Sequence, residues 1–126
     1  MREVVKTHLP SEEAPIEWAV TADGVLYTAQ IPIYADGKIE TGDIEKQADL
    51  TFSNLKKTVE AAGGALTDVT QVLVYLTGKE HFAKMNEVYR RYFSKPFPNR
   101  ATIICAGLMV PGAVIEVVAY AHIKKK

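Results

Sequence analysis

Two charged residues stand in stretches of the sequence where a charge is costly. Arg100 opens the apolar run 101–106, and Glu116 interrupts a second apolar run at 113–121. Both runs are short, rich in β-branched residues and bounded by proline or glycine, which is typical of buried strands. A buried charge without a partner costs roughly several kcal/mol, so each should have a reason to be there. A guanidinium beside a carboxylate in a cleft would suit a small carboxylic acid as substrate.

The residues alone leave two interpretations of this pair open. Arg100 and Glu116 could form a structural ion pair between adjacent strands, or Glu116 could face an aqueous subunit interface. In favour of a functional role, the planar guanidinium of arginine can bind a carboxylate through two parallel hydrogen bonds. Glu116 shares its strand face with Val114, Val118 and Tyr120, an apolar setting that should raise its pKa. Such a carboxyl group can position a water or exchange protons near neutral pH.

Two amphipathic helices are predicted to support these strands. Asp43 begins the first helix, and Gly63 ends it, because glycine adopts the left-handed conformation at little steric cost. Its apolar stripe, at spacings of three and four, consists of Ile44, Ala48, Phe52, Leu55, Val59 and Ala62. The second helix has an aromatic stripe and stops before Pro96. That stripe consists of Phe82, Met85, Tyr89, Tyr92 and Phe93.

The remaining strands flank the two helices. Residues 16–20 and 25–29 are expected to pair as a hairpin, because Asp23 and Gly24 supply the positive φ values that a tight turn demands. A further strand at 69–76 lies between the helices, and the two C-terminal runs follow the second helix. This order predicts an α+β fold, with two helices packed on one face of a mixed sheet.

Composition limits the class of protein and its partners. The 126 residues suffice for a single domain, 1–126, with a real core. Lysine plus arginine equal aspartate plus glutamate at 15 each, so neither nucleic acid nor a membrane is an expected partner. The N-terminus lacks the apolar core of a signal peptide, and the cytoplasm is the expected compartment. The single Cys105 fits a reducing compartment and is expected to be an inert core thiol.

A metal site is not expected. The three histidines, His8, His81 and His122, show no metal-ligand spacing, and the sequence has no Cys-x-x-Cys or His-Glu-x-x-His motif. Nothing resembles a phosphate-binding loop. Arg100 and Glu116 therefore remain as the candidates for chemistry.

Several stretches together resemble one family. The run from Arg100 to Leu108 is followed by Glu116 in the last strand. Further matching stretches are 28–32, 47–48, 54–55, 59–63, 72–76 and 82–93. Over residues 15–123 the chain is similar to the Rid family (RidA/YjgF), whose members are often labelled translation-inhibition or L-PSP endoribonuclease proteins.

The resemblance implies a fold and an activity. It implies a chorismate-mutase-like α+β fold that forms a homotrimer, with three clefts between neighbouring subunits. It also implies hydrolysis of reactive enamine or imine intermediates, such as 2-aminoacrylate and 2-aminocrotonate, to 2-keto acids and ammonium. The substrates would be small and carboxylate-bearing, and no metal or organic cofactor is implied.

Two residues take catalytic roles from the resemblance. Arg100 matches the arginine that binds the substrate carboxylate, and Glu116 matches the glutamate that positions the attacking water. Thr28 falls where the family often has serine in the cleft, and Ala29 falls where it usually has glycine. Thr102 replaces a cysteine that is common in the best-studied members.

Another position borders the implied cleft. Ile16 falls near an aromatic residue, usually tyrosine, in the family. Trp18 lies two residues on and is a candidate to replace that aromatic in substrate binding, with core packing as its alternative role. Because Ala29 and Ile16 alter the cleft wall, the pocket could instead suit a longer enamine acid such as 2-aminomuconate.

Two other classes of function stay open. One is a non-catalytic trimer whose clefts bind 2-keto acids or similar carboxylates as a regulator, which would use the same Arg100. The other is the ribonuclease of the older family label, which the zero net charge and the lack of a basic aromatic groove disfavour.

Overall fold

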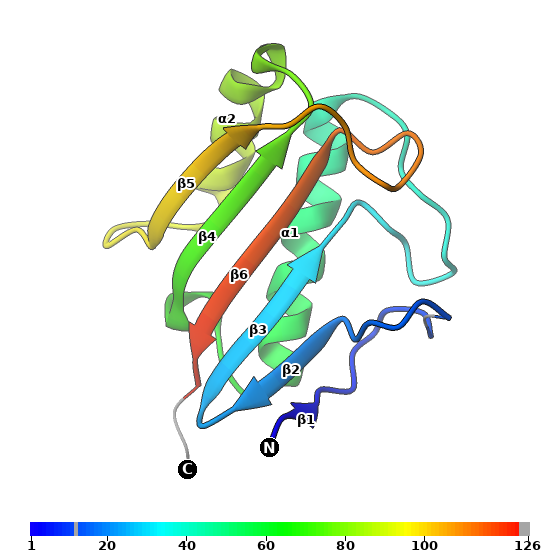
Figure 1. Ribbon diagram of the computed structural model, residues 1–126. Coiled ribbons are helices and arrows are strands. Elements are labelled where there is room, and N and C mark those ends of the chain that lie inside the picture. The colour runs from blue at the N-terminus through cyan, green and yellow to red at the C-terminus, as the bar shows by residue number, and fades with distance from the viewer. Residues whose placement is uncertain (12, 124–126) are drawn as a thin grey trace.

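One mixed sheet forms the front of the molecule in Figure 1, which shows the computed structural model of the chain. The structure describes residues 1–11 and 13–123. From edge to edge the strand order is β1-β2-β3-β6-β4-β5, and β4 and β5 are the parallel pair. The strands are β1 (Glu3–Val4), β2 (Ala19–Ala22), β3 (Val25–Gln30), β4 (Val69–Leu76), β5 (Asn99–Ile104) and β6 (Ile115–His122). The last two strands of the chain are therefore separated by β4 rather than paired with each other.

Two helices cover one face of this sheet (Figure 1). α1 (Ile44–Ala61) begins as predicted at Asp43, whose carboxylate accepts a hydrogen bond of 3.0 Å from the Lys46 backbone N–H. Gly63 follows its end with a φ of +92°. α2 (Phe82–Tyr92) lies against α1, and two short 3₁₀ turns precede β4 and α2, at Leu66–Asp68 and Lys79–His81.

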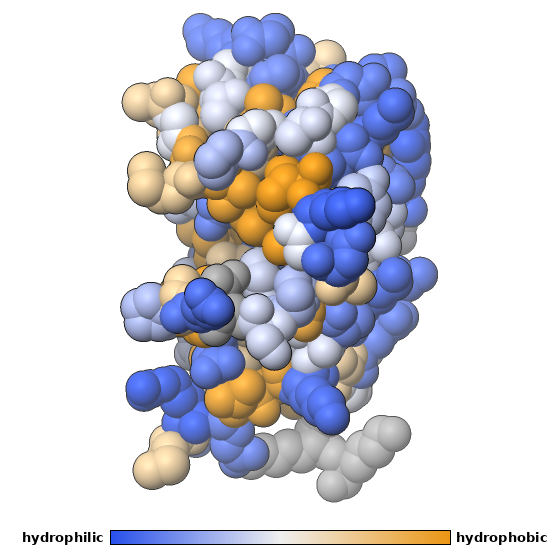
Figure 2. All heavy atoms as spheres, turned by 90° about the vertical axis from the view of Figure 1, so that its right-hand side faces the viewer, coloured by the Kyte–Doolittle hydropathy of each residue, from blue (hydrophilic) through white to orange (hydrophobic). Residues whose placement is uncertain are grey.

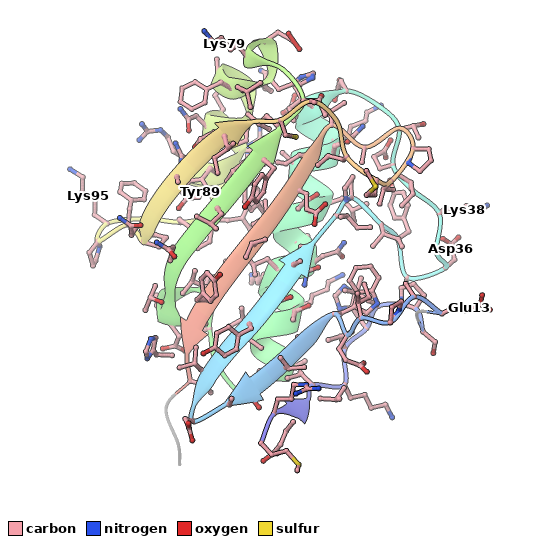
Figure 3. All side chains as sticks on the ribbon, viewed as in Figure 1. Glu13, Asp36, Lys38, Lys79, Tyr89 and Lys95 are labelled. Carbon is pink, nitrogen blue, oxygen red and sulfur yellow. The ribbon has the colours of Figure 1, made fainter. Side chains whose placement is uncertain are left out.

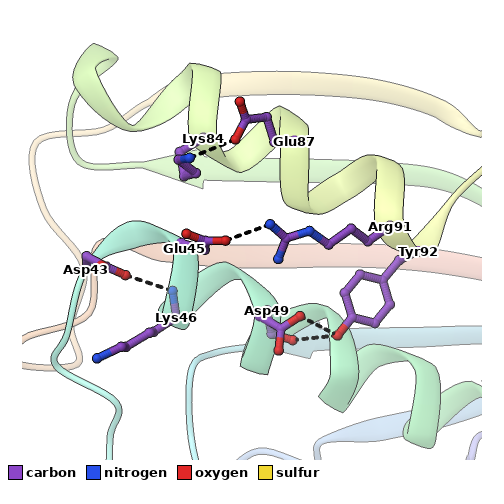
Figure 4. A network of polar contacts seen from close by, with 8 residues as sticks. All are labelled: Asp43, Glu45, Lys46, Asp49, Lys84, Glu87, Arg91 and Tyr92. Carbon is purple, nitrogen blue, oxygen red and sulfur yellow. Dashed lines mark hydrogen bonds and ion pairs between the residues drawn. The ribbon is translucent and has the colours of Figure 1, made fainter.

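The core lies between the helices and the sheet, because each strand presents every second side chain to the helices. Phe52 on α1 is fully buried and meets the aromatic rings of Tyr89 and Phe93 edge to face. The outward surface of the helices is polar, and Figure 2 shows mainly hydrophilic residues along the right-hand outline of the side view. Figure 4 shows how Arg91 and Tyr92 of α2 reach Glu45 and Asp49 of α1 across that surface.

The α+β prediction is confirmed: two helices lie on one face of a mixed sheet. The hairpin at Asp23 and Gly24 is also confirmed, with φ values of +51° and +78°. In the described part of the chain, no helix is both long and apolar enough to span a membrane.

Two predictions about strands are wrong. The strand expected at 16–20 starts only at Ala19, and Ile16 is exposed on a loop. The run after Arg100 is not buried, because β5 is the edge of the sheet and its residues Ala101, Ile103 and Ile104 are exposed. An edge strand has a neighbour on one side only, so apolar composition by itself does not bury it.

Candidate functional site

Arg100 and Glu116 lie on opposite faces of the sheet. Residues that pair across neighbouring strands point to the same face. Arg100 pairs with Val72 of β4, which is fully buried beneath the helices, so Arg100 belongs to the helical face. Glu116 pairs with Tyr75, which pairs in turn with Ile103, and all three belong to the face that no helix covers. A structural ion pair between adjacent strands is therefore excluded within one chain.

Arg100 is held by an aromatic ring rather than by an acid. Its guanidinium carbon lies 4.5 Å from the ring centroid of Tyr89, which comes from α2 behind the sheet (Figure 3). A cation–π contact of this kind contributes about 0.5–2 kcal/mol and leaves the edge of the guanidinium free to donate hydrogen bonds. Over residues 1–11 and 13–123, no carboxylate forms an ion pair with Arg100.

The Tyr89 side chain has an unusual hydroxyl. The ring is 4% exposed, and the hydroxyl is buried without a hydrogen-bond partner among the described residues. Burial raises the pKa of this phenol, and the charge of Arg100 opposes that shift. The phenol therefore stays neutral near pH 7, and its ring serves as a platform for the guanidinium.

A hollow of about 220 Å³ opens beside Arg100, between α2 and β5. This volume is below the range of about 300–1,000 Å³ typical of pockets for drug-sized ligands, so the hollow suits a small metabolite. Two arginines and an asparagine provide donors, and two aromatic rings and a proline provide apolar walls. The lining residues are Asn86, Tyr89, Arg90, Phe97, Pro98 and Arg100.

Glu116 occupies a different environment in the middle of the sheet. It is half-buried on β6, on the same face as Val118 and Tyr120. Burial raises the pKa of its carboxyl group, as the sequence predicted from the apolar neighbours on that face. None of the described residues makes a hydrogen bond or an ion pair with this carboxyl group, so it is available to a water or a ligand.

Gln47 of α1 fixes the loop that leads into β6. Its side-chain N–H₂ donates to the Gly42 and Gly112 carbonyls at 3.1 and 3.0 Å, and its carbonyl oxygen accepts from the Val114 backbone N–H at 2.8 Å. The side chain is 1% exposed, so these bonds form in a region of low polarity, where they are strong. Gln47 therefore positions the residues immediately before Glu116.

The other predicted site residues are dispersed over the sheet. Thr28 of β3 is buried on the helical face, where its hydroxyl donates to the Trp18 carbonyl at 2.6 Å and accepts from Gln30 at 2.9 Å. Ala29 pairs with Val118 and lies on the uncovered face, next to the row that holds Glu116. The Trp18 indole donates to the Pro10 carbonyl at 2.8 Å near the far edge of the sheet.

Thr102 is the one predicted residue that accompanies Arg100. It lies two positions further along β5 and pairs with the buried Val74, so both side chains leave the same face of the edge strand. Glu116 lies on β6, two strands away and roughly 10 Å from β5 across the sheet, and its side chain belongs to the opposite face. One chain therefore carries two half-sites: Arg100 with Thr102 at the β5 edge, and Glu116 with Ala29 on the uncovered face.

Several residues around these half-sites were not predicted from the sequence. Asn86, Arg90 and Phe97 surround Arg100, and Gln47 supports the approach to Glu116. Of these residues, only Gln47 could have been noticed from the local sequence, because it is a polar residue that interrupts the apolar face of α1. Across the described ranges, no three side chains of histidine, cysteine, aspartate or glutamate gather as a metal site would require.

Comparison with known proteins shows which family the chain belongs to. The model of the family described as Endoribonuclease L-PSP matches residues 6–123. The chain belongs to this family, the L-PSP or Rid family. A RutC family protein of Pyrococcus horikoshii is 40% identical to the chain over 124 residues, which cover 95% of the chain and 98% of that protein.

Solved structures of similar proteins show the same fold. RidA from an Antarctic Psychrobacter is 31% identical with a TM-score of 0.89, and the match covers 96% of this chain and 99% of that one. The TdcF protein of E. coli, crystallised with bound serine, is 29% identical with a TM-score of 0.88, and the match covers 97% and 99% of the two chains. The resemblance drawn from the motifs around Arg100 and Glu116 is thereby confirmed at the level of the family.

Proposed function

We propose that this protein hydrolyses reactive enamine and imine derivatives of small amino acids, such as 2-iminopropanoate and 2-iminobutanoate, to 2-keto acids and ammonium. The observation that carries the proposal is the state of Arg100. It lines a small hollow, rests on an aromatic ring and has no acidic partner in the described chain. A guanidinium in this state is ready to bind the carboxylate of a 2-imino acid with two hydrogen bonds.

The reaction needs little beyond orientation. The C2 atom of a 2-imino acid is electrophilic, so a water can add to it while the nitrogen takes up a proton. The resulting carbinolamine loses ammonia when the C2–N bond breaks and the C2–O bond becomes a carbonyl. Fixing the carboxylate on Arg100 and the water on Glu116 would supply the proximity that such a reaction requires.

Glu116 suits the proton transfers in this scheme. Its carboxylate would accept a proton from the attacking water, and the carboxylic acid would return it to the departing nitrogen. A carboxyl group whose pKa is raised toward neutrality does both more readily than one that is always ionised. The raised pKa of Glu116 therefore supports its role in turnover, and Arg100 serves binding and orientation.

We propose further that the complete site forms between copies of the chain, in a homotrimer. The uncovered face of the sheet carries Leu73, Tyr75 and Val118 together with the exposed Tyr27 and Ile103, and no helix lies over it. An apolar face of this extent is usually an interface. Packing the β5 edge of one copy against the uncovered face of the next would bring Arg100 and Thr102 to the Glu116 and Ala29 of the neighbour.

The test measures how fast an imine disappears. A dehydratase acting on serine generates 2-aminoacrylate, and the rate of its conversion to pyruvate and ammonium is compared with the rate in buffer. We expect acceleration by the wild-type protein, and a loss of about tenfold to a hundredfold or more in Arg100→Ala, as expected for a charged bidentate contact. Arg100→Lys keeps the charge but loses the pair of parallel N–H donors, so its rate should lie between those of the wild type and Arg100→Ala.

Two results would redirect the assignment. If no small enamine acid is hydrolysed faster than in buffer, but 2-keto acids bind to the wild type and to Glu116→Gln alike, the protein is a carboxylate-binding regulator. If RNA is cleaved by the purified protein and no longer by Arg100→Ala, the activity in the family description applies instead. The equal numbers of basic and acidic residues, 15 of each, provide no field that would attract RNA.

A further inference from the structure

The hollow beside Arg100 is lined by a second arginine that the reaction above does not use. Arg90 of α2 lines the same hollow, and no acid is among the lining residues. Within the described ranges, Arg90 forms no ion pair, whereas Arg91, the next residue, binds Glu45 of α1 at 2.6 Å (Figure 4). Two neighbouring arginines therefore have different surroundings, and the exposed Arg90 is the one that lines the hollow.

Two unpaired positive charges around one small space favour a ligand with two negative charges. Like charges raise each other's free energy, by about 1–4 kcal/mol at 4 Å depending on the local dielectric constant, and by less at longer range. A monocarboxylate on Arg100 neutralises one of them and leaves Arg90 without a partner. A ligand with a second acid group would neutralise both, and the amide of Asn86 offers it an uncharged donor.

The apolar walls of the hollow limit the length of the ligand. Phe97, Pro98 and Tyr89 help to line a space of about 220 Å³, enough for a short carbon chain. Carboxylates bind arginine in a planar, two-bonded geometry, which both ends of a dicarboxylic acid can adopt. The combination of two arginines and apolar walls therefore favours a short dicarboxylic acid.

We propose that this protein prefers short dicarboxylic 2-imino acids, such as the imines of aspartate and glutamate, with the C1 carboxylate on Arg100 and the distal carboxylate on Arg90. The turnover part of this inference rests on the proposed deaminase function, and the binding part does not. Arg90 is a specificity-determining residue in this assignment: it contacts the substrate far from the reacting C2 atom.

Kinetics on two substrate classes test the assignment. Amino acid oxidases generate the imines of aspartate and glutamate, and of alanine and 2-aminobutyrate, and imine loss above the buffer rate is measured. For Arg90→Gln we expect kcat/KM to fall about tenfold or more on the dicarboxylic imines and to stay within about twofold on the monocarboxylic ones. Arg91→Gln is the matched control on the same helix and should change neither. Arg90→Lys should restore part of the loss.

Binding of the product keto acids separates this inference from the deaminase function. Calorimetry should show that 2-oxoglutarate binds more tightly than 2-oxobutanoate, and that Arg90→Gln removes this difference. If no imine is hydrolysed but this difference depends on Arg90, the deaminase proposal fails and the dicarboxylate site stands.

The opposite pattern overturns the dicarboxylate site. If monocarboxylic imines are hydrolysed and Arg90→Gln affects both substrate classes equally, or neither, the distal contact does not exist and the deaminase function stands alone. A preference for the longer 2-aminomuconate over the imines of aspartate and glutamate, lost in Arg90→Gln, would keep Arg90 in its role but would overturn the short chain length. Thermal unfolding of each variant identifies any loss that comes from misfolding.

Discussion

The strands β5 and β6 carry the two charged residues of the site in opposite settings. β6 lies between β3 and β4, and its helix-facing side chains Ile115, Val117 and Ala119 are almost completely buried. β5 is bonded to β4 alone at the edge of the sheet, and most of its side chains are exposed. The central strand provides a fixed position for an acid, and the edge strand provides a cation that a partner can reach.

This difference explains why neither charge is paired with another of the described residues. Neighbouring strands and Gln47 fix Glu116 on a face that no helix covers, whereas Arg100 rests on Tyr89 beside an open hollow. Pairing them internally would need them on one face, and the intervening β4 sets them on opposite faces. Groups that are left unpaired at such cost are expected to serve binding or catalysis.

The largest expected effect is complementation between two inactive variants. Arg100→Ala and Glu116→Gln should each lose nearly all activity. If each site combines Arg100 of one copy with Glu116 of the next, chains mixed in equal amounts and reassembled at random should regain about a quarter of the wild-type activity, because a quarter of the interfaces join two intact residues. Imine hydrolysis before and after mixing measures this. A mixture that stays inactive, although native mass spectrometry shows mixed trimers, places both residues of a site in one chain.

The next largest effect is a difference in stability between two matched substitutions, one on β6 and one on β5. Ile115→Ala on β6 creates a cavity in the core and should cost about 2–5 kcal/mol in the free energy of unfolding at any protein concentration. Ile103→Ala on β5 removes the same atoms from a residue that is 38% exposed, and its cost should grow with protein concentration, because it acts on association. Urea unfolding at two concentrations measures both. A cost at Ile103 that is independent of concentration would argue against an interface on this face.

The sequence predicts those features that depend on local periodicity. The stripe of α1, the Asp43 cap and the hairpin at Gly24 follow from spacings within one element, and all are observed. The raised pKa of Glu116 was also predictable, because alternation along one strand determines which neighbours share its face. These inferences need no knowledge of which strands are neighbours.

The features that were missed depend on contacts between distant parts of the chain. Periodicity does not show that β4 lies between β5 and β6, so the opposite orientation of Arg100 and Glu116 could not be read from the sequence. The buried strand predicted after Arg100 failed for the same reason, because an edge strand and a central strand can have the same composition. The hollow with Arg90 also requires α2 and β5 to be placed together in three dimensions.

A smaller effect should come from the support of β6 by α1. Gln47→Leu keeps the size of the side chain but leaves the Gly112 carbonyl and the Val114 N–H without their partner, so it should cost about 1–3 kcal/mol in stability. It should also lower kcat more than it weakens keto acid binding, since it disturbs the approach to Glu116 and leaves Arg100 untouched. Chemical unfolding and steady-state kinetics check the two parts. An equal loss of binding would mean that the half-site at β5 depends on the same loop.

The smallest effect concerns the charge on Glu116. Burial raises its pKa in the folded chain above the unfolded value, so the folded state holds this proton more tightly. The stability that the protonated group contributes is fully present below the usual glutamate pKa of about 4.3 and is lost as the pH rises through the higher folded pKa. Glu116→Gln should therefore gain stability relative to the wild type as the pH rises, by less than about 1 kcal/mol, since the half-exposed group is screened by solvent. Urea unfolding at about pH 4 and pH 8 measures the difference. A gain that is absent, or of the opposite sign, would mean that the carboxylate meets a cation in the assembled protein, and Arg100 of a neighbouring copy would be the first candidate.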